Sequence, residues 1–463
     1  MPPQSAVPDP KSGAPLSTEA STELSRLLAP MSPETFLREH WGRKPLFLKA
    51  TPEKRAWVQG LMDRDSFHRA LKQGQQRRSQ RQSQFHIRAM FPSQGGGWMN
   101  VVEVEPHQAN AMLEAGANVC AHDISDGDER LAALAYALKQ QLHFPGEMRF
   151  SCYVSPDGHG LKPHFDAQAV MALQLEGSKT WFFSKEPAVQ SPAANGLLLP
   201  DGTVEWSEEA EGDVPFEEVP TPDLGSFAEA KLEPGDVLYV PAGTWHSTQA
   251  AGSSMGIVLY FSPLPLSNLL EQALWLMGES HPEWRSGPPA AVLSASTQNG
   301  QMPPEVRDYF AHRLAELRGW LENLDPGGLP LQRVWKRFIA QGPPPRMAKA
   351  GAAPRTVERQ DMLSIDAGRP LSYAAGKNTL GEESVHLFCG EEELTLGAGA
   401  GPFIQHLVSQ HQFKAEEALR WGTAGAAYDW EQVQSLLQLL VDQGILLLKS
   451  SEPGREAQEA TRR

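Results

Sequence analysis

Residues 153–183, YVSPDGHGLKPHFDAQAVMALQLEGSKTWFF, are the stretch that decides the fold, and His164 and Asp166 lie at its centre. The residues after Asp166 are largely apolar and include β-formers such as Val170, so this part of the stretch predicts a β-strand. Side chains two positions apart in a strand point to the same face. The pattern therefore places one imidazole and one carboxylate side by side on the face that this strand presents.

A second segment, residues 233–246 (EPGDVLYVPAGTWH), supplies the candidate for a further histidine. Turn residues flank a short apolar strand in this segment, and His246 opens the strand that follows the second turn. A hairpin of this kind brings a histidine to the mouth of a barrel. Two histidines and one carboxylate on one side of a metal leave the opposite positions open, which is the facial triad of non-haem Fe(II) oxygenases. We therefore predict that His164, Asp166 and His246 are metal ligands.

Lys179 follows a turn at Gly177, on the strand that continues the first stretch. An ammonium group held deep beside a metal suits the distal carboxylate of a dicarboxylate ligand. Taken alone, a lysine at the end of a strand is more often solvated, and a lone His-x-Asp pattern is common. The combination of the lysine with three potential ligands favours a cofactor-binding role for Lys179.

These segments resemble the JmjC-type 2-oxoglutarate oxygenases of the cupin superfamily, and in particular the ribosomal-oxygenase branch, which hydroxylates protein side chains. The resemblance rests on His164-Phe-Asp166, on LQLEGSKTW (173–181) and on PGDVLYVPAGTWH (234–246). It implies an α+β protein with a double-stranded β-helix (cupin, jelly-roll) core. It also implies Fe(II) on His164, Asp166 and His246, dioxygen as the oxidant, and a 2-oxoglutarate co-substrate whose tail pairs with Lys179.

The resemblance further implies that the phenol of Tyr153 touches the 2-oxoglutarate tail, although Tyr153 is equally well interpreted as a core aromatic residue. The last predicted barrel strand, residues 253–262, departs from the family pattern. Gly256 stands where the family carries a histidine, and Tyr260 stands where a serine is expected. Ser262 lies two residues further on the same face, so either Tyr260 or Ser262 is a candidate for the second co-substrate contact.

Three functions are compatible with these residues. The first is hydroxylation of a side chain of a ribosomal or other basic protein. The second is a 2-oxoglutarate oxygenase of another class, acting on a small molecule, on a peptide natural product, or as a histone-type lysine demethylase. The third is a cupin-like binding protein without enzymatic activity, which has no physical need for two histidines, an aspartate and a lysine to converge.

Composition narrows the choice of partners. Lys+Arg number 41 and Asp+Glu number 56, a formal net charge of −15, which favours a basic partner over nucleic acid. No apolar run approaches the ~20 residues of a membrane span, and the N-terminus lacks a signal pattern. The cysteines Cys120, Cys152 and Cys389 are too widely spaced for a disulfide framework or a zinc set. We therefore expect a cytoplasmic protein without a membrane partner.

The 463 residues predict several units. We expect a disordered N-terminus (1–27), a JmjC/cupin catalytic domain (28–263), a helical dimerisation module (264–340), a linker (341–357), a winged-helix-like domain (358–450) and a disordered tail (451–463). The dimerisation module and the winged helix are implied by the resemblance together with apolar stripes at helical spacing, and they predict a homodimer. The second domain lacks a basic recognition helix, so we expect it to contact protein.

Two polar segments of the predicted catalytic domain remain. Residues 73–84 form a polar run with several arginines, which predicts a solvated loop or, as the alternative, a mobile lid over the substrate. Residues 190–225 carry nine Asp and Glu and no Lys or Arg. Because this insertion lies between the two ligand-bearing segments, it belongs near the barrel mouth. There it would attract a basic peptide, or it is a solvated excursion.

Overall fold

The computed structural model describes residues 22–80, 83–91, 99–207, 219–290, 301–342, 355–365, 370–378, 381–422 and 428–448. Its main feature is an antiparallel sheet in which eight strands follow one another side by side. In order across the sheet they are β1 (Leu46–Leu48), β11 (Val237–Val240), β7 (Ala169–Phe183), β12 (His246–Ser262), β5 (Glu147–Ser155), β4 (Asn118–His122), β2 (His86–Phe91) and β3 (Asn100–Glu103).

Four further strands attach to this sheet and close it over itself. They are β10 (Ala228–Leu232) on β7, and β6 (His164–Phe165), β8 (Gly196–Leu198) and β9 (Val204–Trp206), which pair in sequence beyond β12. The long strands β7 and β12 change partners along their length: β12 pairs with β5, β6 and β7. A strand shared in this way folds the sheet into two facing walls. The predicted double-stranded β-helix of the JmjC/cupin type is confirmed.

The Pro-Gly-Asp turn before β11 has a structural explanation. Asp236 is fully buried, and its carboxylate accepts hydrogen bonds from the backbone N–H groups of Glu233 (2.9 Å) and Ala50 (2.8 Å). Lys49 lies 2.9 Å from the same carboxylate. This aspartate therefore ties the chain just after β1 to the hairpin that carries His246.

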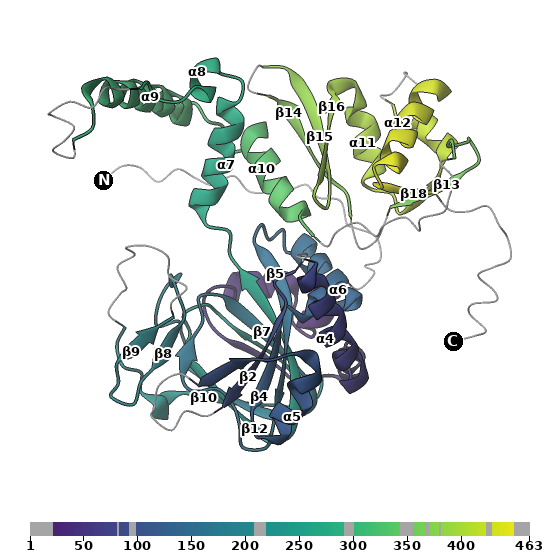
Figure 1. The fold of residues 1–463 in the computed structure, drawn as a ribbon. Coiled ribbons are helices and arrows are strands. Elements are labelled where there is room, and N and C mark those ends of the chain that lie inside the picture. Colours follow the sequence, from purple (N-terminus) through teal and green to yellow (C-terminus); the bar gives the residue numbers. More distant parts are fainter. Residues whose placement is uncertain are drawn as a thin grey trace.

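Helices cover the outer face of the sheet (Figure 1). They are α1 (Glu23–Leu28), α2 (Pro33–Glu39), α3 (Pro52–Gln59), α4 (Arg64–Ser79), α5 (Ala109–Glu114) and α6 (Glu129–Gln141), with short 3-10 turns η1 (Pro106–Gln108), η2 (Ile124–Asp126) and η3 (Leu224–Ser226). Ser32 caps α2 and Pro33 opens it, as the sequence predicts. Buried Phe36, Phe67 and Tyr239 belong to the core between these helices and the sheet.

Two predictions about the N-terminal half are wrong. The boundary placed at residue 27 lies inside α1, where Leu24 and Leu27 are buried, so the ordered core begins before that residue. The polar run 73–84 is also not a loop from its start, because α4 continues to Ser79. Its buried positions Ala70, Leu71 and Gly74 hold the helix on the core, whereas Arg77 and Arg78 are partly exposed.

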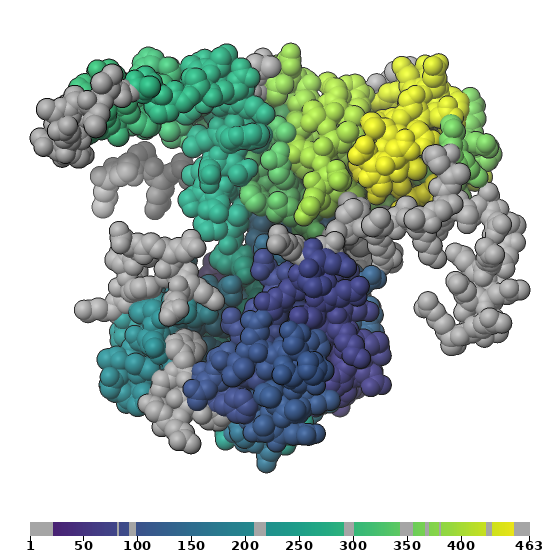
Figure 2. Space-filling model, in the orientation of Figure 1, coloured from purple at the N-terminus to yellow at the C-terminus, as the bar shows by residue number. Residues whose placement is uncertain are grey.

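A second layer lies above the sheet domain in Figures 1 and 2, in green to yellow. Its first part contains α7 (Leu266–Gly278), α8 (Pro282–Arg285), α9 (Pro304–Glu322) and α10 (Leu329–Ala340). The hydroxyl of Tyr136 on α6 donates to the carbonyl of Ala340 (2.9 Å), and Lys139 donates to that of Gln341 (3.0 Å). These bonds attach the end of α10 to the sheet domain. Helices therefore fill the region of the predicted apolar stripes at helical spacing, and α9 buries none of its residues.

The C-terminal part contains two three-stranded antiparallel sheets. One is β14 (Ser372–Lys377), β15 (Glu383–Cys389) and β16 (Glu392–Gly397); the other is β17 (Gln412–Lys414), β13 (Met362–Ile365) and β18 (Leu446–Leu448). They pack with α11 (Gly401–Leu407), α12 (Trp430–Asp442), η5 (Ala398–Ala400) and η6 (Ala415–Arg420). Val357 is buried in this core, so the part begins within the predicted linker, of which 343–354 lie outside the described residues. The predicted tail 451–463 also lies outside them.

Candidate functional site

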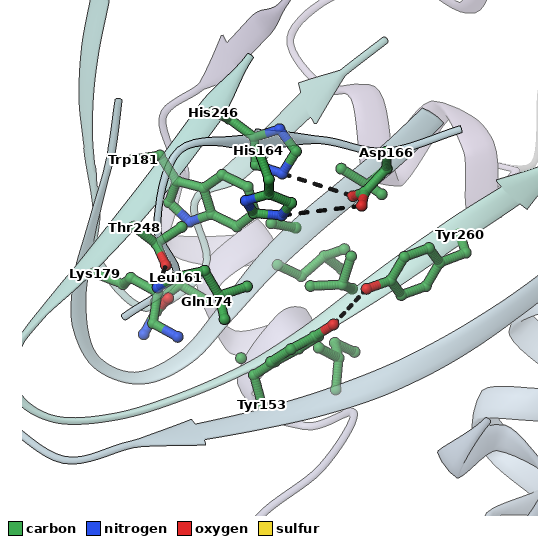
Figure 3. Close-up of a pocket in the computed structure, with 16 residues that line it drawn as sticks. Tyr153, Leu161, His164, Asp166, Gln174, Lys179, Trp181, His246, Thr248 and Tyr260 are labelled. Carbon is green, nitrogen blue, oxygen red and sulfur yellow. Dashed lines mark hydrogen bonds and ion pairs between the residues drawn. The ribbon is translucent and has the colours of Figure 1, made fainter. Parts of the chain in front are cut away.

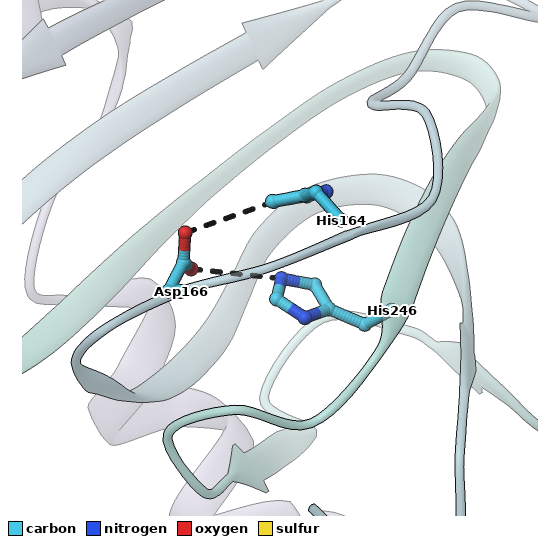
Figure 4. A group of neighbouring side chains, drawn as sticks. All are labelled: His164, Asp166 and His246. Atoms are coloured by element: carbon cyan, nitrogen blue, oxygen red, sulfur yellow. Dashed lines mark ion pairs between the residues drawn. The ribbon is translucent and has the colours of Figure 1, made fainter. Parts of the chain in front are cut away.

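The three predicted ligands come together at the open end of the β-helix (Figure 4). His164 is on β6, His246 opens β12, and the two residues are paired directly across these strands. Asp166 follows β6 immediately. Its carboxylate oxygens lie 3.9 Å from Nε2 of His164 and 3.6 Å from Nε2 of His246. One ligand atom from each residue lies within 4.8 Å of the others, as expected for a shared metal ion.

Backbone carbonyls fix the orientation of both imidazoles. Nδ1 of His164 lies 2.7 Å from the carbonyl of Lys162, and Nδ1 of His246 lies 2.9 Å from that of Thr244. A carbonyl only accepts, so each Nδ1 carries the proton and donates, and each Nε2 presents a lone pair towards Asp166. Burial lowers the pKa of His246 to about 4, with the neighbouring His164 acting in the same direction. The imidazole is therefore neutral at pH 7, which is the form that binds metal.

The loops that carry the ligands are tied to each other. The N–H of Gly243 donates to the carbonyl of Asp166 (2.8 Å), which joins the turn before His246 to the turn after β6. Gly243 has φ +72°, and a Cβ there would lie 1.9 Å from the carbonyl oxygen of Val189, so only glycine fits. The ring of Trp181 stacks on His246, with centroids 5.6 Å apart and an interplanar angle of 18°. These contacts fix the positions of the ligand set.

Lys179 lies in the cavity behind the ligands (Figure 3). This cavity has a volume of about 550 Å³ and is lined by both predicted ligand segments and by Tyr153 and Tyr260. The ammonium of Lys179 donates to the hydroxyl of Ser155 (2.9 Å) and faces no carboxylate among the described residues. Burial lowers its pKa to about 8. A buried cation without a counter-ion is the arrangement expected of a site that binds an anionic group.

Tyr153 and Tyr260 face each other across the same cavity (Figure 3). Their hydroxyls share a hydrogen bond of 2.5 Å, and burial raises the pKa of both phenols well above the ordinary value. Tyr153 is therefore a cavity residue as well as an aromatic packed on the core of the β-helix. Both rings are neutral hydrogen-bonding groups at physiological pH.

The two candidates for the second co-substrate contact, Tyr260 and Ser262, differ in the cavities that they line. Tyr260 and Gly256 line the cavity of Lys179, whereas Ser262 lines only a wider cleft of about 2050 Å³ outside it. A side chain at Gly256 would meet the carbonyl of Leu173, since an added Cβ lies 3.2 Å from that oxygen. Geometry thus favours Tyr260 over Ser262 at the inner cavity.

Sequence reasoning missed several residues of the inner cavity. Thr248 and Trp181 line it, and Ser155 accepts the hydrogen bond of Lys179. Each lies two positions along a strand from His246, Lys179 or Tyr153, so period-2 alternation could have placed them on the same face. Gln174 was also missed. Its amide donates to the hydroxyl of Ser254 (2.9 Å) and to the carbonyl of Glu176 (2.7 Å), so it closes the far end of the cavity.

The wider cleft leads from the ligands to the outer strands of the sheet. Its lining includes His164 and Asp166 at one end and Met90, Met99 and Val101 at the other. Asn195 and Ser207, which lie within the predicted acidic insertion, also line it. Most of the acidic residues of that insertion fall within 208–218, outside the described residues. Its role at the cleft therefore stays a prediction.

The fold and the site define a class: a β-helix protein with a buried set of two histidines and one carboxylate, and a lysine in the cavity behind it. The donor atoms suit a divalent iron, because imidazole and carboxylate on one side leave the other side for further ligands. The family described as the JmjC domain matches residues 134–269. Proteins named ribosomal oxygenase are among those to which the chain is similar.

Ribosomal oxygenase 1 of Gallus gallus is 25% identical over 346 residues, which are 72% of this chain and 53% of that protein. The bifunctional lysine-specific demethylase and histidyl-hydroxylase NO66 of Drosophila persimilis is 25% identical over 262 residues, 55% of this chain and 34% of that protein. The chain thus spans about half or less of these relatives. YcfD, a ribosomal oxygenase from Escherichia coli solved with cobalt and 2-oxoglutarate, has a TM-score of 0.51 at 17% identity, covering 91% of this chain and 99% of that one.

None of the described helices is long and apolar enough to cross a membrane.

Proposed function

We propose that this protein is an Fe(II)- and 2-oxoglutarate-dependent dioxygenase that hydroxylates a side chain of another protein. The observation that carries the proposal is that a set of potential metal ligands and a buried cation lie in one cavity. Three ligand atoms lie within 4.8 Å of one another, and the cation of Lys179 lies in the same cavity without a carboxylate partner among the described residues. A metal and a dicarboxylate co-substrate account for both at once.

The residues have distinct roles in this proposal. Nε2 of His164, Nε2 of His246 and the carboxylate of Asp166 hold the iron, which supplies the oxidising chemistry with dioxygen and 2-oxoglutarate. Lys179 binds the distal carboxylate of 2-oxoglutarate, and the hydroxyls of Tyr153 and Tyr260 contact the same co-substrate. Apolar walls such as Val170 and Val258 exclude water from the cavity. The protein thereby orients the reactants and excludes water from the site of reaction.

The substrate that we propose is a ribosomal or other basic protein. The net charge of the chain, −15, supports a positively charged substrate. The names of the chicken and Escherichia coli relatives point to the same class.

A lysine demethylase is the second candidate, favoured by the name of the Drosophila relative. Binding a methylated ammonium requires a cage of aromatic rings. Among the described residues that line the cleft, Tyr153 and Tyr260 are the phenolic rings, and their hydroxyls bond to each other. Hydroxylation therefore remains the better supported reaction.

We further propose that residues 264–340 form a dimerisation module and that the protein is a cytoplasmic homodimer. The face of α9 supports this, because Phe310 (42% exposed), Leu314 (61%) and Leu321 (47%) are apolar and uncovered. The unit of β13, β17, β18, α11 and α12 is compatible with a winged-helix-like domain that contacts protein. Its α12 begins at Asp429 and Glu431, which disfavour nucleic acid. The three cysteines are buried and form no disulfide bond, as expected in a reducing compartment.

Succinate release from 2-oxoglutarate tests the proposal. Purified protein is incubated with Fe(II) and ascorbate, with and without total ribosomal protein, beside the His246→Ala variant. We expect stimulation by ribosomal protein that the variant loses. Turnover without stimulation would retain the oxygenase and reject the substrate class. Absence of turnover from protein that binds Fe(II) would reject the enzyme.

A further inference from the structure

The strand at the outer end of the cleft has a free edge. β3 is the last strand of the eight-strand order, and no strand among the described residues pairs with its outer side. All its residues are exposed, and Val101 and Val102 are each 49% exposed. Folded proteins usually protect such an edge with lysine, proline or a covering element, because it is a template for another strand. Here two apolar β-formers occupy the edge instead.

The register shows which backbone groups point outward. The N–H of Val104 donates to the carbonyl of Ile87 (2.9 Å), so residues of the same parity, Asn100 and Val102, direct their backbone groups towards β2. Val101 and Glu103 lie at the alternate positions. Their N–H and C=O groups therefore point away from the sheet, and together they offer the bonding pattern that one further strand requires.

The free edge is continuous with the proposed active site. Val101 and its cross-strand partner Met90 line the same cleft as His164 and Asp166. A chain laid along β3 would therefore lie on the rim of the cleft that leads to the metal ligands. The net charge of −15 favours a basic chain at this rim over a second copy of this acidic one.

We propose that β3 binds the protein substrate by strand addition: an extended segment of a basic polypeptide pairs with the outer edge of β3 and anchors the substrate at the cleft. This inference rests on the proposed function for the identity of the occupant. Main-chain hydrogen bonds to Val101 and Glu103 supply affinity without demanding a particular side chain, and the exposed Val101 and Val102 favour apolar or β-branched residues in the anchor.

The sheet also fixes how far the anchor lies from the reaction. Four strand-to-strand steps separate β3 from β12, which carries His246. The anchored segment lies one step beyond β3, so at ~4.8 Å per step it is about 24 Å from β12 across the sheet, a distance that about seven extended residues span. The residue that reacts therefore lies outside the paired segment. Substrate peptides shortened to fewer than about seven residues between the two parts should lose the contribution of the anchor.

Proline substitution tests the edge with little disturbance of the sheet. Val101→Pro removes one outward N–H and leaves the ladder to β2 intact, since proline is tolerated where the N–H faces solvent. Val101→Ala is the matched control, because it removes the same side chain and keeps the donor. Glu103→Pro is compared with Glu103→Ala, because Glu103 also forms an ion pair with Arg78. Equal melting temperatures within each pair verify the fold.

Two measurements, with total ribosomal protein as the probe, test whether the substrate pairs with β3. Hydrogen exchange at the amides of Val101 and Glu103 should slow when the probe is added, whereas the amides of Asn100 and Val102, already bonded to β2, should change little. The KM for the probe should rise about fivefold in Val101→Pro relative to Val101→Ala, the usual effect of one hydrogen bond, with kcat unchanged.

Each result has one meaning. Protection elsewhere in the cleft but not at Val101 and Glu103, or equal KM in the proline and alanine variants, overturns strand addition and leaves the proposed function standing. Protection at both amides without any stimulated turnover supports docking at β3 and rejects the proposed function. Protection that depends on the concentration of this protein alone, together with a change in its sedimentation, assigns the edge to a second copy and rejects the substrate as occupant.

Discussion

Replacement of Lys179 by methionine should make the protein more stable and its co-substrate site weaker. Lys179 is buried, and its ammonium has a hydroxyl, that of Ser155, as its hydrogen-bond partner. Burial lowers its pKa from 10.5 to about 8, which corresponds to about 3 kcal/mol of destabilisation of the charged form at roughly 1.4 kcal/mol per pKa unit. Methionine has a similar length and no charge, so it fills the same space.

The expected magnitude follows from two opposing effects. Removing the buried charge stabilises the folded state by about 3 kcal/mol, and leaving the hydroxyl of Ser155 without its donor costs about 1 kcal/mol. The net gain in the free energy of unfolding is about 2 kcal/mol. Because the pKa is lower in the folded state, the destabilisation is fully present below pH 8 and disappears as the pH rises from about 8 towards 10.5. The gain is therefore greatest at neutral pH.

Urea unfolding and co-substrate binding measure the two sides of this prediction. The variant and the natural protein are compared at pH 7 without 2-oxoglutarate, and the affinity for 2-oxoglutarate is then measured by titration. Loss of a charge-assisted hydrogen bond should weaken that affinity by about 10- to 100-fold. The assignment of Lys179 as the cation that binds an anionic ligand would be refuted by either of two results. The variant would be less stable than the natural protein, or it would bind 2-oxoglutarate as tightly.

Three further predictions follow from the same geometry. The affinity for 2-oxoglutarate should fall by about tenfold per pH unit above pH 8, because Lys179 loses its proton there. Titrations at several pH values measure this profile, and Lys179→Arg, which stays charged, should flatten it. Trp181→Ala, which removes the ring stacked on His246, should lower metal affinity by about tenfold in calorimetry while Trp181→Phe retains most of it; equal loss in both would contradict a stacking role. Leu314→Glu on the exposed face of α9 should give monomers in sedimentation, whereas persistence of a dimer would place the interface elsewhere.

The metal ligands of the site were predictable because short sequence patterns indicate them. His164 and Asp166 share a strand face by alternation, and the turn-framed His246 follows a hairpin signal, so the three ligands meet as the sequence indicated. The pairing of Tyr153 with Tyr260 was not predictable in the same way. It depends on the register between β5 and β12, which sets strands about a hundred residues apart side by side.

The fold was predictable in its core and less so at its margins. Composition suggested disorder up to residue 27, but the apolar spacing of Leu24, Leu27 and Leu28 lets a short helix pack on α6. The polar run after Lys72 continues as a helix, because one buried stripe is enough to hold α4 on the core while its other faces remain polar. The free edge of β3 results from the order of the strands in the sheet, and no local sequence pattern specifies that order.

The most direct test of the central claim is the mass of ribosomal proteins after incubation with this protein, Fe(II) and 2-oxoglutarate. The proposed hydroxylase predicts that one component gains the mass of a single oxygen atom, and that the gain disappears when His164→Ala or His246→Ala replaces the natural protein. Loss of methyl groups from the substrate instead would indicate a demethylase. Unchanged masses, under conditions in which the protein turns 2-oxoglutarate over to succinate, would contradict a ribosomal substrate.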